Sequence, residues 1–510
     1  MATFNTNIAG AGYGSVYVDA LVWGNAGWNV STGPITWWLA GPGEATASDN
    51  PGTQTVMAWT DAERAAFREI LQLYSSVSGL TFQEAANVQS ANLIQWKVGN
   101  AAFGNDTTAG DHEVPMSGTH FGNPNSLFGR YNYEQLPSWD QNYKGGDGYQ
   151  TLVHEIGHGL GLAHPHDGGD RPDLNVFPGV TGEQVMGDFN LNQSPYSTMS
   201  YVESFRSLFG SLATEAEYGR NGGLGPFDIA ALQRMYGANM TNASGANVYE
   251  MPTANVRGTY WSTIWDAGGT DTLSNEASST GSTMDLRGAP LVGPEAGGYA
   301  SFNVGIQGGF LIANGVVIEN AIGGSGADTI TGNDAWNMVD GRGGADVIKL
   351  GIGNDVAFAG AGADQAYGGW GNDKLSGGAG DDTISGGMGD DFVFAGADND
   401  VIYAGMGNDV VFAGSGADTV FGGAGNDTIW GGAGNDQLWG GLGADQFAFA
   451  AGSGADTISG FNQAEGDRLA LQGQTYTTSN VGGNVVLALS GGGSITLEGV
   501  SNFVPNDFIA

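Results

Sequence analysis

The sequence lacks cysteine and has few basic side chains, and each shortage excludes a class of protein. None of the 510 residues is Cys, which excludes a disulfide scaffold, thiolate metal sites and a cysteine nucleophile. Only 15 residues are Lys or Arg, against 53 Asp or Glu, so the formal net charge is −38. Nucleic acid and anionic membranes bind basic surfaces, so we expect neither as a partner.

Long apolar runs are also missing. No stretch reaches the roughly 18 apolar residues of a transmembrane helix, so we expect no membrane span. Residues 1–30 contain no Lys or Arg and no apolar core of a signal peptide, which predicts that no secretory signal peptide stands there. Hydrophobic residues make up 41% of the chain, too many for a disordered acidic protein. The protein is therefore expected either to stay in the cytosol or to leave the cell by another route.

Glycine is abundant instead, and between residues 323 and 448 it recurs with aspartate every nine residues. The unit is GGxGxDxUx, where U is apolar, and residues 422–430 show it in full. The span holds fourteen units, with Asn337 in one aspartate position. The aspartates in register are Asp328, Asp346, Asp355, Asp364, Asp373, Asp382, Asp391, Asp400, Asp409, Asp418, Asp427, Asp436 and Asp445. This is the pattern of the calcium-binding parallel β-roll of RTX proteins, and a flexible linker has no reason to keep it.

The chemistry of the unit agrees with calcium. Glycine permits the positive φ angles of a tight turn, and an Asp carboxylate is the hard oxygen ligand that Ca²⁺ prefers. The residue U points inward from a short strand, and two units make one turn of the roll, so strands of one sheet lie 18 residues apart in sequence. Asn337 replaces an aspartate and Asp398 a glycine, which argues against full calcium occupancy near 332–340 and 395–400.

Residues 154–164 read HEIGHGLGLAH. On a helix His154 and His158 share one face and can reach one metal ion, while Gly161 can end the helix and bring His164 around as third ligand. Three imidazoles leave a position open for water, as in catalytic zinc sites, and Glu155 stands beside the first ligand as a candidate general base. The extended motif is the metzincin signature, and the alternative is a helix with three unrelated histidines.

Residues 196–201 read YSTMSY, and YGAN follows at 236–239. Together with WDAGGTDT at 265–272, IENAIGG at 318–324 and the repeats, these motifs make the chain resemble serralysin-type secreted metalloproteases. The resemblance implies zinc at His154, His158 and His164, with Glu155 as general base and then proton donor. It also implies that Met199 lies beneath the histidines and that Tyr201 is a zinc ligand at rest which swings away to stabilise the oxyanion.

The same resemblance implies calcium sites before the repeats and a route of export. The implied calcium residues are Arg257, Thr259, Asp266, Gly268, Gly269, Asp271 and Glu319. The tail Asp507–Ala510 resembles the acidic and apolar end of a type I secretion signal, so the type I secretion machinery is an expected partner.

The expected fold is an α+β metzincin catalytic domain at 1–240 followed by an all-β parallel β-roll. We expect a β-rich segment with calcium sites at 241–322, the RTX roll at 323–448, and a C-terminal β cap with the secretion signal at 449–510. Within the first domain a capping box at Thr60 predicts a helix reaching Val77, and 227–236 reads as a second helix. Residues 80–82 and 92–98 read as strands.

The expected function is a secreted zinc endopeptidase that cleaves protein or peptide substrates outside the cell or at its surface. The rivals are a calcium-dependent surface-layer or adhesive protein with an inactive protease domain, and a protease specialised for one surface-layer protein.

Two ladders of aromatic residues are expected to point outward from the roll, at Phe394, Phe412 and Trp430 and at Tyr403, Phe421 and Trp439. Their spacing favours stacking between strands, and the alternative is binding of glycan or a surface layer. His112, His120 and His166 read as surface or core residues.

Overall fold

The computed structural model describes residues 3–5, 15–22, 27–44, 56–98, 109–113, 126–134, 144, 146–166, 176–178, 180–202, 219–501 and 503. His120 and the tail 507–510 therefore lie outside the described residues. The chain divides into two compact units: unit 1 comprises residues 1–245, 252–269 and 288–316, and unit 2 comprises 246–251, 270–287 and 317–510. The expected boundaries at 240, 322 and 448 stay predictions. No helix in the described part of the chain is both long and apolar enough to cross a bilayer.

Unit 1 is built on a five-stranded sheet with the order β4-β3-β5-β7-β6, in which only β6 runs antiparallel to its neighbour. The strands are β3 (Ile35–Ala40), β4 (Phe82–Glu84), β5 (Leu93–Val98), β6 (Gly110–His112) and β7 (Leu127–Asn132). β1 (Thr3–Asn5) pairs with β2 (Gly27–Asn29), and β13 (Gly309–Ile312) lies between β9 (Trp261–Ile264) and β12 (Ser301–Asn303). The helices are α1 (Val16–Ala20), α2 (Asp61–Val77), α3 (Asp147–Gly159) and α5 (Pro226–Tyr236), with 3-10 turns η1 (Val30–Thr32), η2 (Val88–Ser90) and η5 (Asp188–Asn190).

The predicted helices of unit 1 are confirmed. α2 begins after Thr60, whose side chain and that of Glu63 form the expected capping box, and it ends at Val77. α5 ends before Gly237, whose φ of 79° stops the helix. The strand expected at 92–98 is β5, whereas the one expected at 80–82 begins only at Phe82, since Leu80 is buried ahead of the sheet rather than paired in it.

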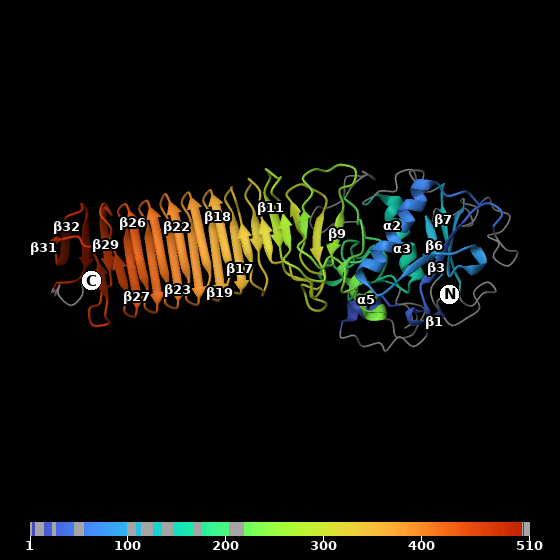
Figure 1. The fold of residues 1–510 in the computed structure, drawn as a ribbon, viewed down its shortest axis with the longest axis horizontal. Helices are drawn as coiled ribbons and strands as arrows, with labels where there is room; N and C mark the ends of the chain where they lie inside the picture. The colour runs from blue at the N-terminus through green and yellow to red at the C-terminus, as the bar shows by residue number, and fades with distance from the viewer. Residues whose placement is uncertain are drawn as a thin grey trace. The chain divides into compact units, whose positions relative to one another are not determined.

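Unit 2 is a roll of two parallel sheets whose strands alternate along the chain (Figure 1). One sheet contains β8 (Val248–Glu250), β10 (Thr272–Ser274), β14 (Asn320–Ile322), β16 (Met338–Asp340), β18 (Val356–Ala361), β20 (Lys374–Ala379), β22 (Phe392–Ala397), β24 (Val410–Ser415), β26 (Thr428–Ala433), β28 (Gln446–Ala448) and β30 (Arg468–Ala470). The other contains β11 (Ser282–Asp285), β15 (Thr329–Thr331), β17 (Val347–Ile352), β19 (Gln365–Trp370), β21 (Thr383–Met388), β23 (Val401–Met406), β25 (Thr419–Ala424), β27 (Gln437–Leu442) and β29 (Ala455–Ser459). Two units per turn are thereby confirmed.

The register of the roll is 18 residues, as Thr383 pairing with Val401 shows. The apolar residue of each unit points inward, and Ile384, Ile402 and Val420 are fully buried. The C-terminal end is closed by β33 (Ser494–Glu498), β32 (Asn484–Leu489) and β31 (Tyr476–Val481), joined antiparallel to one another. These are the strands expected to cap the solenoid, which would otherwise expose an unpaired sheet edge.

Aromatic rings stack along both sheets of the roll. The ring centroids of Tyr403 and Phe421 lie 5.1 Å apart, those of Phe421 and Trp439 4.7 Å, and those of Phe412 and Trp430 4.3 Å, each pair within 19° of parallel. Phe412 also meets Phe392 at 5.5 Å in a tilted arrangement. The ladder of Tyr403, Phe421 and Trp439 is thus stacked along its whole length. In the other ladder, the stacked pair is Phe412 and Trp430.

Candidate metal centre

Helix α3 carries the first two histidines of the motif. His154 and His158 are one turn apart and are 7% and 6% exposed. The helix stops after Gly159, and Gly161, with a φ of 99°, reverses the chain as its position in the motif predicts. The turn is closed by the Leu162 N–H, which donates to the Gly157 carbonyl at 2.9 Å, and His164 follows it.

The three imidazoles converge on one point. The Nε2 atom of His164 lies 3.0 Å from Nε2 of His154 and 3.0 Å from Nε2 of His158. The opposite nitrogens of the two helix histidines face carbonyls, with Nδ1 of His154 3.0 Å from the Thr198 oxygen and Nδ1 of His158 2.8 Å from that of Leu162.

These carbonyl contacts decide the tautomers. A carbonyl only accepts, so each Nδ1 carries the proton and each Nε2 presents a lone pair. The lone pairs of His154 and His158 thus both point to Nε2 of His164 at 3.0 Å, where a cation would let His164 turn a lone pair to the same point without repulsion. His154, His158 and His164 therefore form a group that can hold one metal ion, and three imidazoles suit catalytic zinc.

Glu155 follows the first histidine and is buried, with 7% of its surface exposed. Strand β6 passes close to it, since a Cβ on Gly110 would lie 3.1 Å from Glu155 Cγ. Burial, and secondarily the charge of Asp111, raises the pKa of Glu155 to about 8. A cation at the histidines would favour the ionised carboxylate and oppose this shift.

Tyr201 lies against the histidines, and Met199 of the same turn lies against helix α3. Met199 is fully buried beneath α3, where a Cβ on Gly157 would stand 2.8 Å from its sulfur. The Tyr201 ring is 39% exposed, with its centroid 4.7 Å from that of His164 and 5.4 Å from that of His154. The structure thus brings together all the residues expected around zinc, while their catalytic roles stay predictions.

Asp228 is a residue of this region that sequence reasoning missed. It is fully buried in the first turn of α5, and its carboxylate accepts hydrogen bonds from Ser197 Oγ at 2.7 Å, the Thr198 N–H at 2.6 Å and the Gly225 N–H at 2.8 Å. Burial raises the pKa of Asp228 to about 7, and the three hydrogen bonds oppose that rise. In the sequence, Asp228 is only an acid in the first turn of a helix, and this position indicates a helix cap. It does not indicate the hydrogen bonds to the turn at 197–199, whose Thr198 carbonyl orients His154.

The remaining described histidines differ in their surroundings. His112 packs over Gly159, where a Cβ would come within 2.4 Å of its ring, and burial lowers its pKa to about 4. Its Nδ1 lies 2.7 Å from the Glu113 carbonyl and its Nε2 2.8 Å from Gln95 Nε2, as in a packed core histidine. His166 instead stacks on His164 with ring centroids 4.9 Å apart, so it is a neighbour of the metal group.

The repeat aspartates form two rows of buried carboxylates in unit 2. From Asp346 to Asp445 each is at most 2% exposed, and each Oδ1 accepts the backbone N–H of the residue 18 positions earlier. The Oδ2 atoms of these twelve side chains have no hydrogen-bond partner in the described structure. Buried acceptors without donors fit a hard cation that binds oxygen, and calcium is such an ion.

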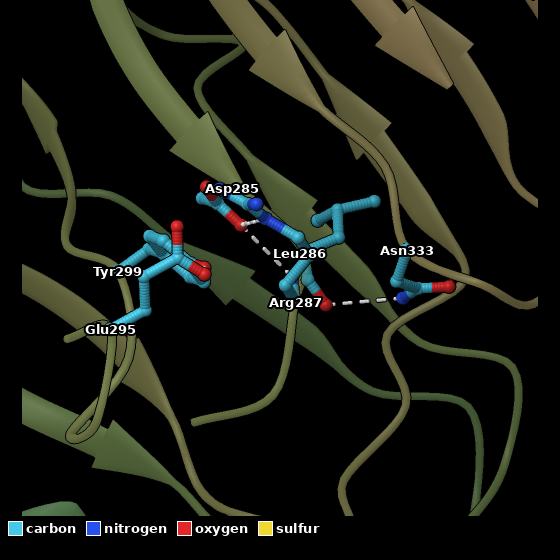
Figure 2. A network of polar contacts seen from close by, with 6 residues as sticks. All are labelled: Asp285, Leu286, Arg287, Glu295, Tyr299 and Asn333. Atoms are coloured by element: carbon cyan, nitrogen blue, oxygen red, sulfur yellow. Dashed lines mark hydrogen bonds and ion pairs between the residues drawn. The ribbon is translucent and has the colours of Figure 1, made fainter. Parts of the chain in front are cut away.

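The turn around Asn337 is different. Its Oδ1 accepts the Asn333 N–H at 2.8 Å and its Nδ2 donates to the Glu319 carbonyl at 3.2 Å. The Asn333 side chain donates in turn to the Leu286 carbonyl at 3.0 Å, as Figure 2 shows, and to that of Ile318 at 2.8 Å. Protein groups thus satisfy the side-chain polar atoms of Asn337 and Asn333, while incomplete calcium occupancy at 332–340 stays a prediction.

The residues expected to bind calcium before the repeats lie in both units, and their roles stay predictions. In unit 1 the buried Asp266 accepts the Gly268 N–H at 2.9 Å, Gly268 and Gly269 have φ of 129° and 155°, Thr259 is buried and Arg257 is exposed. In unit 2 the buried Asp271 accepts the Asn247 N–H, and its own N–H donates to Glu319.

Comparisons with known proteins match both halves of this description. The family model of the matrixin metallopeptidases matches residues 51–170, and that of the RTX calcium-binding nonapeptide repeat matches four times, at 318–348, 351–384, 385–420 and 412–447. The chain therefore joins a matrixin domain to RTX repeats, which implies zinc in the first and calcium in the second.

The similarity to individual proteins is equally specific. The chain is 37% identical over 273 residues to Serralysin C and 31% identical over 301 residues to Serralysin B, both of Dickeya chrysanthemi, and 31% identical over 286 residues to Metallopeptidase AprA of Pseudomonas marginalis. These alignments cover 51–56% of this chain and 51–56% of each relative, so the chain spans about half the length of the curated relatives it matches. The expected resemblance to serralysin-type metalloproteases is confirmed.

Proposed function

We propose that this protein is a secreted zinc endopeptidase whose roll folds on binding calcium. The observation that carries the proposal is the convergence of three Nε2 atoms, two of them oriented by backbone carbonyls, beside a buried glutamate. The matrixin match and the serralysin relatives support the same reaction class.

The residues of the centre suit hydrolysis of a peptide bond. Zinc, when held by His154, His158 and His164, supplies a Lewis acid and lowers the pKa of water. Glu155 takes the proton of the attacking water and returns it to the leaving amine. The Tyr201 hydroxyl donates a hydrogen bond to the oxyanion that develops on the scissile carbonyl, after moving from its resting position beside His164. No Ser or Cys nucleophile is needed.

The full chain, loaded with zinc and calcium, tests this proposal in a casein cleavage assay. We expect o-phenanthroline to abolish cleavage and added zinc to restore it. Glu155→Gln should keep one zinc per chain and lose nearly all cleavage, because it keeps the shape of the side chain without its basicity. Retention of more than about a tenth of the rate would refute the general-base assignment. Absence of any zinc-dependent cleavage would instead favour an RTX adhesive protein with an inactive protease domain.

The calcium rows suggest how export and folding are coupled. Without cations the carboxylates within each buried row repel one another, so the roll should be expanded at cytosolic calcium and compact at millimolar calcium outside the cell. An expanded chain can pass through a type I secretion channel, and the tail 507–510 is the proposed signal. Full β-sheet circular dichroism in excess EDTA would contradict this coupling.

The aromatic ladders suggest retention at a surface. Phe421 and Trp439 stack at 4.7 Å and Phe412 and Trp430 at 4.3 Å, which stabilises adjacent strands and also forms an apolar stripe that a glycan or a surface-layer protein could contact. Changing all four to Thr should lower thermal stability and, if a cell-surface glycan or surface-layer protein is bound, also abolish retention on cells. Unchanged retention would limit the ladders to a structural role.

A further inference from the structure

The two edges of the roll differ in the residues that end their strands. In the sheet of β17, β19, β21, β23, β25 and β27, strand pairing brings the last residue of each strand into one row (Figure 1). This row, which we call the ridge, consists of Ile352, Trp370, Met388, Met406, Ala424 and Leu442. In the other sheet β18, β20, β22, β24 and β26 end in small residues, which are Ala361, Ala379, Ala397, Ser415 and Ala433. The turns of the roll therefore accept small residues here, and the ridge is not a requirement of the fold.

The ridge exposes large apolar side chains. Its five large members are between 44% and 68% exposed, and Trp370 is 61% exposed. At about 200 Å² for a side chain of this size, the exposed part amounts to roughly 600 Å². The largest apolar patch of a typical monomer covers about 300–600 Å² and often marks a contact with another molecule. The ladder of Tyr403, Phe421 and Trp439, three residues earlier in the same strands, extends this surface toward the roughly 800 Å² that each partner contributes to a stable interface.

The order of side chains in the ridge suits a second copy of the same ridge lying antiparallel to it. Strands of a sheet are evenly spaced, so a two-fold axis between Met388 and Met406 would place each of these residues opposite the other one of the second copy. The same axis places Trp370, the largest side chain of the ridge, opposite Ala424, the smallest. A bulky residue thus meets a gap on both sides of the axis, as a well-packed interface requires.

Charge is absent from the ridge, although the whole chain carries −38. None of its six residues is ionisable, and interface cores are likewise rich in Trp and Met and poor in charged residues. Two positions later in each turn, side-chain oxygens accept backbone N–H groups 18 residues further on, in a row formed by Asn354, Asn372, Asp390, Asn408 and Asn426. The two-fold axis sets Asp390, the one acid of this row, opposite Asn408, so no like charges meet.

From this match of size and charge we infer that the ridge is a dimer interface, along which two copies of the chain pack antiparallel. The inference goes beyond the proposed peptidase activity and requires only that the roll is folded. Repulsion between two acidic chains opposes association at long range, and salt screens it beyond about 8 Å at physiological ionic strength. An apolar dimer of acidic chains should therefore tighten as salt is added, whereas a dimer held by ion pairs would loosen.

Sedimentation equilibrium measures this association on the full chain, loaded with zinc and calcium and carrying Glu155→Gln to prevent self-cleavage. We expect a dimer with a dissociation constant in the micromolar range or below. Trp370→Ser should raise the dissociation constant at least about 100-fold, because a two-fold axis repeats the loss in both copies. Ser415 stands at the equivalent position of the other edge, so serine fits the turn. Phe358→Ser, which removes a 49% exposed aromatic from the other sheet, is the matched control and should leave association unchanged.

Introduced cysteines test the antiparallel register, because the chain has no cysteine of its own. The two-fold axis places Ile352 opposite Leu442 of the second copy, so a mixture of Ile352→Cys and Leu442→Cys chains should form a disulfide-linked dimer on mild oxidation. Either variant alone should not, because its two cysteines would lie five strand spacings apart, roughly 24 Å, whereas a disulfide needs Cα atoms within about 7 Å. Cross-linking of each variant with itself would overturn the antiparallel arrangement.

The remaining outcomes decide whether the ridge binds a second copy. A parent chain that sediments as a monomer at about 100 μM overturns the inference, as does a dimer that salt loosens or that both serine variants weaken equally. A monomeric parent whose Trp370→Ser variant alone loses retention on cells assigns the ridge to a cell-surface partner and also overturns it. Circular dichroism in calcium identifies a variant that has failed to fold, and Met406→Ser then takes its place. Casein cleavage by the wild-type chain is measured separately, so failure of the dimer leaves the proposed peptidase intact.

Discussion

Removing the Asp228 carboxylate should loosen the turn that orients His154, the first histidine of the proposed zinc site. Asp228→Ala leaves the Thr198 and Gly225 N–H groups and the Ser197 hydroxyl without their acceptor. The hydroxyl can rotate, so two buried donors remain unsatisfied, at about 1–3 kcal/mol each. The variant no longer buries a carboxylate, and burial is costly here because it raises the pKa of Asp228 to about 7. This relief offsets part of the cost, so we expect the free energy of unfolding to fall by about 3 kcal/mol.

That loss corresponds to a fall in melting temperature of about 6–12 °C for a domain of 150–250 residues. The Thr198 carbonyl accepts from His154 Nδ1, so zinc affinity should also drop, by about 10- to 100-fold. Both quantities are best measured on the Glu155→Gln background, which prevents self-cleavage, by calorimetry in saturating calcium and by competition with a zinc chelator.

Asp188→Ala, which removes an exposed aspartate of the same unit, is the control and should change neither quantity. A melting temperature of Asp228→Ala within about 2 °C of its parent would refute the stability argument. Unchanged zinc affinity in a destabilised protein would reduce Asp228 to a purely structural role.

Three further predictions concern single features of the two units. Gly157→Ala places a Cβ 2.8 Å from the Met199 sulfur, so it should destabilise unit 1 and weaken zinc binding. Gly182→Ala is the control, because nothing lies within 4 Å of its new Cβ, and it should leave melting temperature and zinc affinity unchanged in the same assays. Tyr201→Phe should lower kcat by at most about 10³-fold with zinc content retained, and an unaltered kcat would refute the oxyanion role. Burial, and secondarily neighbouring aspartates, raises the pKa of Asp391, Asp400 and Asp427 to about 7, so without calcium these carboxylates bind protons more readily in the folded roll than in the unfolded chain. Their contribution to the stability of the metal-free roll is therefore full below about pH 4 and is lost as the pH rises through about 7. In EDTA the β-sheet circular dichroism should increase on acidification, and a decrease between pH 7 and pH 5 would contradict the sign of this pH dependence.

The sequence specified the elements whose signals are local. The capping box at Thr60, the left-handed turn at Gly161 and the nine-residue period all depend on neighbours in the chain, and each lies where it was predicted. The link from Asp228 to the turn at 197–199 joins segments some 30 residues apart, and no local pattern marks it. Asp456 is a similar case, because strand pairing places it next to Asp436 although the two are 20 residues apart, so the nine-residue period does not mark it.

Both proposed metal sites orient their side chains through backbone groups, which explains why motifs indicate the candidate ligands but not the groups that orient them. In the histidine group, a backbone carbonyl fixes one nitrogen of His154 and the other points to the place proposed for zinc. In the roll, a backbone N–H fixes one oxygen of each aspartate from Asp346 to Asp445, and the other oxygen has no donor among the described residues. Any residue can supply a backbone group, so the orienting partner leaves no mark in the sequence. The ligand type is readable from the chain, but whether a ligand is open to a cation depends on its second atom.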